Sequence, residues 1–144
     1  MKGRWLVSNE ASPVAAPAEL RYTAEHEWIQ RVDATTVRVG ITDYAQSQLG
    51  DVVFVQLPAV GDSVRSGDSM GEVESTKSVS DIYAPLSAKV VAVNGDLESS
   101  PDKVNTEPYG AGWLVELAVD DEHALAQAWE AMLDAAGYVS VVEG

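Results

Sequence analysis

Short alternations of apolar and polar residues, separated by turn residues, run along the chain from Leu20 onward. In TVRVGIT, residues 36–42, β-branched side chains alternate with Arg, Gly and Thr, which predicts a half-buried strand. Similar runs at 51–58, 88–94 and 113–119 predict further strands. Because no long helix alternates with these runs, the pattern favours a mainly β sandwich or barrel over a parallel α/β fold.

Turn and helix signals fall between the predicted strands. The dipeptide Gly-Asp occurs at 50–51, 61–62, 67–68 and 95–96, where Gly allows positive φ and Asp can bond the local backbone. Thr42 or Asp43 is placed to cap a short helix that runs to Leu49 and ends at Gly50. A second short helical turn is predicted in SSPDKVN, residues 99–105.

The C-terminal segment changes to a helical period. Its apolar positions follow the spacing i, i+4, i+7, i+8, i+11, and three acidic residues precede them. We expect one amphipathic helix over about 121–136 that packs on the β core, with Gly137 as its stop. The apolar positions are Leu125, Trp129, Met132, Leu133 and Ala136.

The first 18 residues show no period, and their only apolar run is Trp5-Leu6-Val7. We expect residues 1–18 to form a disordered extension and residues 19–144 to form the folded domain.

Composition excludes several classes of function. The net charge of −14 argues against nucleic acid as a partner, because phosphate binding requires basic patches. The absence of cysteine excludes disulfides and thiolate chemistry, and two distant histidines make a metal centre implausible. No apolar run approaches the roughly 20 residues that cross a membrane.

Lys77 is one of only four lysines and lies in GEVESTKS, residues 71–78. The string falls short of a phosphate-binding loop, because Thr76 stands where the second Gly belongs and two glutamates would face the phosphate. A catalytic amine would need an apolar pocket to lower its pKa, and the flanking residues are polar. An ordinary surface lysine and a lysine that another enzyme acylates both remain open. Small polar flanks at the tip of a hairpin would expose the amine, and Glu74 would be a recognition mark for a modifying enzyme.

The segment GEVESTKSVSDIYAPLSAKVVAVN, residues 71–94, resembles the lipoyl-attachment segment of glycine cleavage system H proteins. Three further stretches, at 22–28, 39–64 and 108–114, resemble the same family in the same order. Ala88 and Lys103 depart from the family pattern, and both lie away from the hairpin that carries Lys77. Biotin carriers are disfavoured, because their lysine typically lies between two methionines.

This resemblance implies a fold and a function. The fold would be a lipoyl hammerhead of two small antiparallel sheets with short helices and the C-terminal helix. The chain would be a non-catalytic carrier that holds lipoate on Lys77 and passes an aminomethyl group from glycine decarboxylase, a PLP enzyme, to a tetrahydrofolate-dependent aminomethyltransferase. Dihydrolipoamide dehydrogenase would reoxidise the carrier, and a lipoate ligase or lipoyl transferase would load it.

The resemblance also implies site residues and a setting. Glu27 and Asp81 would lie near the loaded arm, and His26 is open to a structural or a functional reading. We expect a monomer, cytoplasmic in a bacterium or in the mitochondrial matrix of a eukaryote. Two alternatives remain: an H-like carrier that relays lipoyl groups to other enzymes, and an acidic β binding domain with Lys77 unmodified.

Overall fold

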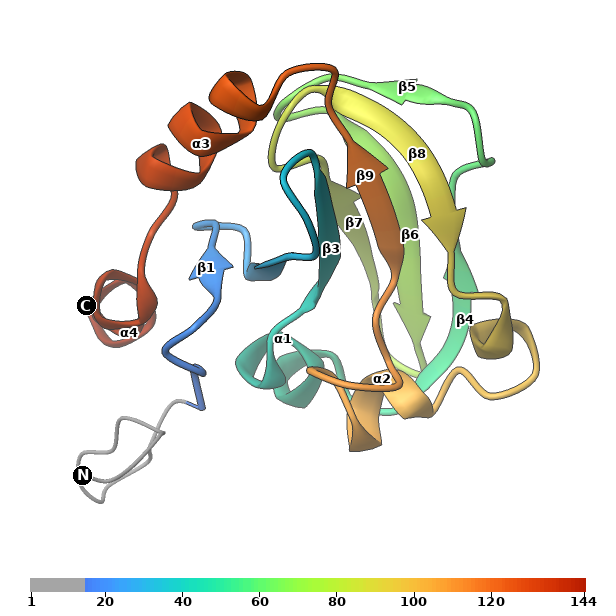
Figure 1. Ribbon diagram of the computed structural model, residues 1–144. Coiled ribbons are helices and arrows are strands. Elements are labelled where there is room, and N and C mark those ends of the chain that lie inside the picture. Colours follow the sequence, from blue (N-terminus) through green and yellow to red (C-terminus); the bar gives the residue numbers. More distant parts are fainter. Residues whose placement is uncertain (1–14) are drawn as a thin grey trace.

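Two antiparallel sheets form the body of the protein in a computed structural model that describes residues 15–144 (Figure 1). One sheet has six strands in the order β1-β2-β3-β9-β8-β5, and the other has three in the order β4-β6-β7. The prediction of a mainly β fold with two antiparallel sheets is confirmed, and the sheets are not closed into a barrel. The strands of the larger sheet are β1 (Arg21–Tyr22), β2 (Glu27–Arg31), β3 (Thr36–Ile41), β9 (Val115–Ala118), β8 (Ala88–Val93) and β5 (Ser63–Val64). Those of the smaller sheet are β4 (Val52–Gln56), β6 (Ser69–Ser75) and β7 (Val79–Tyr83).

Short helices connect the strands. α1 (Asp43–Leu49) begins at Thr42, whose side chain accepts a hydrogen bond from the Ala45 amide, and it ends at Gly50 with φ of 83°. The predicted cap and stop are therefore confirmed. The predicted helical turn near residue 100 corresponds to α2 (Lys103–Thr106), and the 3-10 helix η1 (Gly95–Glu98) precedes it.

The main core lies between the two sheets. Side chains that alternate along β3, β6 and β7 meet there, as the period of two requires. Val37 and Val39 of β3, Val73 of β6 and Ile82 of β7 belong to one buried cluster. The alternation read from the sequence thus positions the small sheet over the large one.

A second, aromatic cluster covers the other face of the large sheet. Trp28 lies opposite Gly40 in the β2–β3 register, and a Cβ on Gly40 would come within 2.6 Å of the Trp28 ring. The strand predicted as half-buried is buried on both faces at Gly40 and Thr42, because Tyr22, Trp28 and Tyr138 cover the second face.

The single predicted helix over 121–136 is also wrong, because the segment forms two helices, α3 (Glu122–Ala131) and α4 (Ala135–Glu143). Met132 is extended, and Leu133 forms an antiparallel bridge with Tyr22 of β1 through hydrogen bonds of 2.8 and 3.0 Å. Asp134 then caps α4 by accepting a hydrogen bond from the Gly137 amide. Gly137 thus lies in the first turn of a second helix. Both helices lie beside β1 at one side of the protein (Figure 1).

The predicted disordered extension falls mostly on residues 1–14, which lie outside the described residues. Residues 15–18 differ from the expectation, because they pack on the aromatic cluster. Ala16 is fully buried, and the hydroxyls of Tyr22 and Tyr109 donate hydrogen bonds to the carbonyls of Pro17 and Ala15. The ordered chain therefore begins before residue 19. Within the described part of the chain, no helix is long and apolar enough to cross a membrane.

Candidate functional site

Lys77 lies at the tip of the hairpin that joins β6 to β7, as the sequence predicts. The backbone of this tip is braced on both sides. The Ser75 amide donates to the Ser78 carbonyl at 2.8 Å, and the Ser75 hydroxyl accepts from the amides of Lys77 and Ser78. The Thr76 amide donates to the Asp51 carbonyl at 3.0 Å, which anchors the tip to the loop after α1. A fixed backbone therefore presents an exposed lysine side chain.

Gly50 provides the surface on which the stem of Lys77 rests. A Cβ built on Gly50 would lie 3.3 Å from Cε of Lys77. The same glycine ends α1 with φ of 83°, a conformation that a residue with a side chain rarely adopts. Gly50 thus ends the helix and, because it has no side chain, lets the Lys77 side chain lie against the backbone. The polar, exposed surroundings do not provide the apolar pocket that a catalytic lysine requires.

A cleft of about 390 Å³ adjoins the hairpin. The first residues of β2, the exposed side of α1 and the first residues of β7 form its walls. Glu25, His26, Glu27, Ile41, Tyr44, Ala45, Gln48, Leu49, Val73, Ser78, Val79, Ser80 and Asp81 line it. The cleft therefore combines apolar surface with three carboxylates, and Ser78 and Val79 connect it to the base of the Lys77 side chain.

Glu27 is the most buried ionisable group of this cleft, with 1% of its surface exposed. Its Oε1 accepts a hydrogen bond from the Thr23 hydroxyl at 2.6 Å, and its Oε2 accepts one from the Tyr83 amide at 2.9 Å. Burial raises the pKa of Glu27 from 4.5 to about 7, and these two hydrogen bonds oppose the rise only in part. A cation in the cleft would therefore stabilise the ionised form of the Glu27 carboxyl group.

Asp81 is exposed at the edge of the same cleft. Its Oδ1 accepts a hydrogen bond from the Ser69 hydroxyl at 2.9 Å, and its Oδ2 accepts one from the Tyr83 hydroxyl at 3.4 Å. Tyr83 thus contacts Glu27 through its amide and Asp81 through its hydroxyl. The structure brings together the two carboxylates that the sequence resemblance singles out.

His26 is held in place by Tyr138, a residue that no pattern in the sequence singles out. Its Nδ1 lies 2.9 Å from the Tyr138 hydroxyl, which lies 2.8 Å from Oγ1 of Thr42. His26 has φ of 75°, and burial lowers its pKa. Because Tyr138 belongs to α4, the C-terminal helix braces the wall of the cleft. Tyr138 lies 112 residues after His26 in the sequence, so no local pattern predicts this contact.

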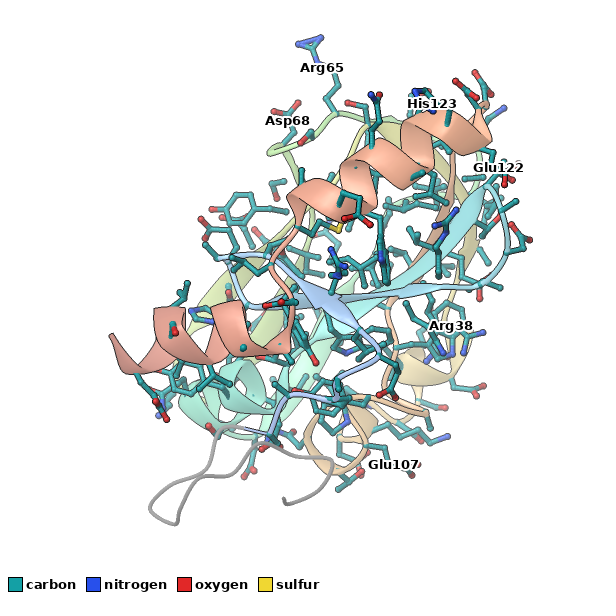
Figure 2. All side chains as sticks on the ribbon, turned by 60° about the vertical axis from the view of Figure 1, so that its left-hand side comes forward. Arg38, Arg65, Asp68, Glu107, Glu122 and His123 are labelled. Atoms are coloured by element: carbon teal, nitrogen blue, oxygen red, sulfur yellow. The ribbon has the colours of Figure 1, made fainter. Side chains whose placement is uncertain are left out.

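Glu74 and the second histidine of the chain, His123, lie outside the cleft. Glu74 is exposed, pairs with Phe54 and Val79 across the small sheet, and does not line the cleft. His123 is exposed at the start of α3 beside Glu122 (Figure 2). Among residues 15–144, no group of His, Asp and Glu is arranged to hold a metal ion.

Comparisons with known proteins add a family assignment to this geometry. The family model described as Glycine cleavage H-protein matches residues 20–143. A glycine cleavage system H protein of Mycolicibacterium smegmatis is 68% identical over 126 residues, which cover 88% of this chain and 95% of that protein. One of Nocardia farcinica is 62% identical over 128 residues, which cover 89% of this chain and 97% of that protein. The crystal structure of a glycine cleavage system H protein from Mycobacterium marinum superposes with a TM-score of 0.72 at 46% identity, over 86% of this chain and 96% of that one.

Proposed function

This chain belongs to the glycine cleavage H-protein family, and from that premise we propose that it carries lipoate in amide linkage on Nζ of Lys77. The family assignment makes the chain the non-catalytic, lipoyl-carrying shuttle component of the glycine cleavage system. The observation that supports Lys77 is its exposed position on a braced hairpin, directly beside the cleft.

The residues of the cleft fit an arm that is apolar along its length and carries a charged group at its end. Ile41, Leu49 and Val73 provide apolar walls. Asp81 lies four residues after Lys77. At about 3.3 Å per residue of strand, the Cα atoms of Lys77 and Asp81 are at most about 13 Å apart. A lipoyl-lysine side chain reaches about 14 Å when its bonds of about 1.5 Å are extended. Its dithiolane would supply the reactive sulfur, and the protein supplies the position.

We propose that Glu27 and Asp81 hold the amino group of the aminomethyl cargo in this cleft. A cationic amine beside a partly desolvated carboxylate forms a charge-assisted hydrogen bond, which contributes about 1.5–3 kcal/mol. The amine would also favour the ionised form of Glu27, whose pKa burial raises. The carboxylates would thereby keep the cargo away from water between enzymes.

The partners we propose are glycine decarboxylase, which loads the cargo, the aminomethyltransferase, which removes it, and dihydrolipoamide dehydrogenase, which restores the disulfide. The net charge of −14 would steer the carrier onto basic rims around their active sites. Tethering raises the effective concentration of the arm at whichever enzyme is bound. We place this cycle in the cytoplasm and propose that the carrier acts as a monomer.

Co-expression with a lipoate ligase tests the attachment site. Intact mass should rise by one lipoyl group, and peptide mapping should place the whole increment on the peptide that contains Lys77. Lys77→Arg should show no increment, and the matched control Lys89→Arg, at an exposed position on β8, should be modified like the wild type. An increment on Lys2, Lys89 or Lys103 would contradict the assignment.

A second experiment tests the two carboxylates. Glu27→Gln and Asp81→Asn should speed the spontaneous release of the cargo from the isolated carrier, followed by intact mass, and leave attachment at Lys77 intact. Glu72→Gln removes an exposed carboxylate that does not line the cleft and is the control. Release rates in both cleft variants equal to that of the control would show that the carboxylates do not hold the cargo.

A further inference from the structure

Asn105 of α2 uses both donors and the acceptor of its side-chain amide to hold residues 50–52, which we call the α1–β4 turn. Its Oδ1 accepts a hydrogen bond from the Val52 amide at 2.8 Å. Its Nδ2 donates to the Gly50 carbonyl at 3.0 Å and to Oε1 of Gln46 at 2.9 Å. One half-buried side chain, between 53 and 59 residues from its partners, thus bonds to the end of a helix and to the start of the strand that follows it.

Tertiary contacts fix the position of Asn105. α2 has four residues and no side-chain cap at its start, and it lies beside α1 (Figure 1). Val104 is fully buried in the main core. The backbone of Gly112 lies so close to α2 that a Cβ there would overlap the carbonyls of Lys103 and Glu107. The core therefore supports α2 from behind, and α2 presents the Asn105 amide to the turn.

The α1–β4 turn that Asn105 holds also supports the lysine hairpin. The carbonyl of Asp51, the middle residue of the turn, accepts the Thr76 amide at 3.0 Å. Gly50 has no side chain, and a Cβ there would lie 3.3 Å from Cε of Lys77. A displacement of the turn would therefore move the tip of the hairpin and the stem of the lysine side chain together.

The same turn lies between two walls of the cleft. Four residues of α1 form one wall, and residues 78–81, after the hairpin tip, form another. Asn105 does not line the cleft. It bonds to α1 directly, and it holds the hairpin through the turn whose Asp51 carbonyl accepts the Thr76 amide. The position of one wall relative to the other thus depends on a side chain outside the cleft.

We propose that Asn105 is a positioning residue of the carrier, because its three hydrogen bonds fix α1 relative to the hairpin and so direct the attached arm into the cleft. This inference rests on the proposed lipoate on Lys77 and on the proposed retention of the aminomethyl cargo beside Glu27. Without these bonds the hairpin tip would move relative to α1, and the end of the arm, about 14 Å from its Cα, would spend more time in water. The cargo would then leave faster, although every group that lines the cleft is unchanged.

The side chain acts through its hydrogen bonds and not through its volume, which Asn105→Asp tests. The replacement has nearly the same shape and keeps an acceptor for the Val52 amide. It also places a carboxylate oxygen against the carbonyl oxygen of Gly50, where the amide donated a hydrogen bond. Two acceptors that face each other repel, so the turn should loosen in Asn105→Asp as it does in Asn105→Ala.

Asn94 provides a matched control, because its side-chain amide makes the same kinds of hydrogen bond elsewhere. Its Nδ2 donates to the carbonyls of Ala111 and Trp113 at 2.8 Å, and its Oδ1 accepts from the Asp96 amide at 3.2 Å. These three partners lie outside α1, the α1–β4 turn and the lysine hairpin. Asn94→Ala should therefore lower the global stability without loosening the hairpin.

Amide hydrogen exchange of the unmodified protein, measured by NMR, tests the hold of Asn105 on the turn. The Thr76 amide should exchange about tenfold faster or more in Asn105→Ala and Asn105→Asp than in Asn94→Ala. The Val90 amide, which donates to the Asp62 carbonyl at 2.8 Å, corrects for changes in global stability. Equal corrected exchange of Thr76 in the two alanine variants, or wild-type protection in Asn105→Asp, would overturn the inference.

Release of the cargo tests the functional consequence. Lipoylated carriers, prepared with excess ligase and checked by intact mass, are loaded with the aminomethyl cargo, and its spontaneous release is followed. Asn105→Ala should release the cargo about tenfold faster than Asn94→Ala, as expected where a charge-assisted hydrogen bond is lost. Equal release rates would overturn the positioning role. The proposed function fails separately: if Glu27→Gln releases the cargo no faster than Glu72→Gln, the cleft does not retain it, and Thr76 exchange still decides whether Asn105 holds the turn.

Discussion

Glu27→Gln is expected to remove a pH dependence of folding that arises in the cleft. Glu27 is buried beneath the cleft, and its carboxyl group has the two acceptor contacts with Thr23 and Tyr83. Desolvation raises its pKa from 4.5 to about 7. A Gln at this position keeps one acceptor for the Tyr83 amide and places its amide group against the Thr23 hydroxyl, and it has no charge to desolvate.

The size and sign of the effect follow from the two pKa values. Between about pH 4.5 and about pH 7 the folded protein holds a proton on Glu27 that the unfolded chain has lost, so the free energy of unfolding falls as the pH rises through this window. At 1.36 kcal/mol for each pKa unit, the contribution is on the order of 3 kcal/mol. Most of it, about 2.5 kcal/mol, is lost between about pH 5 and about pH 8.

Urea unfolding of wild type and Glu27→Gln at these two pH values measures the effect. The wild type should lose about 2.5 kcal/mol more than the variant on going from the lower to the higher pH. The other titrating groups are common to both proteins and cancel in this comparison. Glu72→Gln, which removes an exposed carboxylate, should follow the wild type. Equal pH dependence in wild type and Glu27→Gln would refute the argument that burial controls this carboxyl group.

Three further predictions concern the packing that supports the cleft. Tyr138→Phe should lower the free energy of unfolding by about 1–3 kcal/mol, because it removes the hydroxyl that contacts His26 and the cap of α1, and it should shift the His26 titration measured by NMR. Gly40→Ala should lower the free energy of unfolding by about 1–3 kcal/mol in the same assay, since the added methyl group overlaps the Trp28 ring. The methyl group added by the control Gly95→Ala meets open space. A chain that starts at residue 19 should be about 1–2 kcal/mol less stable than one that starts at residue 15, and equal melting curves would contradict the packing of residues 15–18.

Local patterns predicted the features that local interactions determine. Short alternating runs located β3, β4, β8 and β9, and the small polar residues that flank Lys77 predicted the hairpin tip that exposes it. The cap of α1 and the glycine that ends it could also be predicted from the sequence, because both act within one turn of the helix.

The features that the sequence could not predict arise from contacts between segments that are far apart in the chain. The helical period continues through Met132 and Leu133, but the bridge between Leu133 and Tyr22 breaks it, and nothing near residue 133 records that partner. The contact between Tyr138 and His26, in the wall of the cleft, arises in the same way, through a helix that packs on β1. The sequence pointed to Glu27 only through a family resemblance, because nothing near residue 27 predicts its burial or its hydrogen bond with the Tyr83 amide, 56 residues away.

The exchange of the glycine carboxyl group with labelled bicarbonate, catalysed by glycine decarboxylase, tests the central claim most directly. The carrier is the only component varied, as lipoylated wild type, unmodified wild type or Lys77→Arg treated with the ligase. We expect exchange with the lipoylated wild type and only background exchange with the other two. Exchange at the wild-type rate with Lys77→Arg, or background exchange with a carrier that mass spectrometry shows to be fully lipoylated on Lys77, would contradict it.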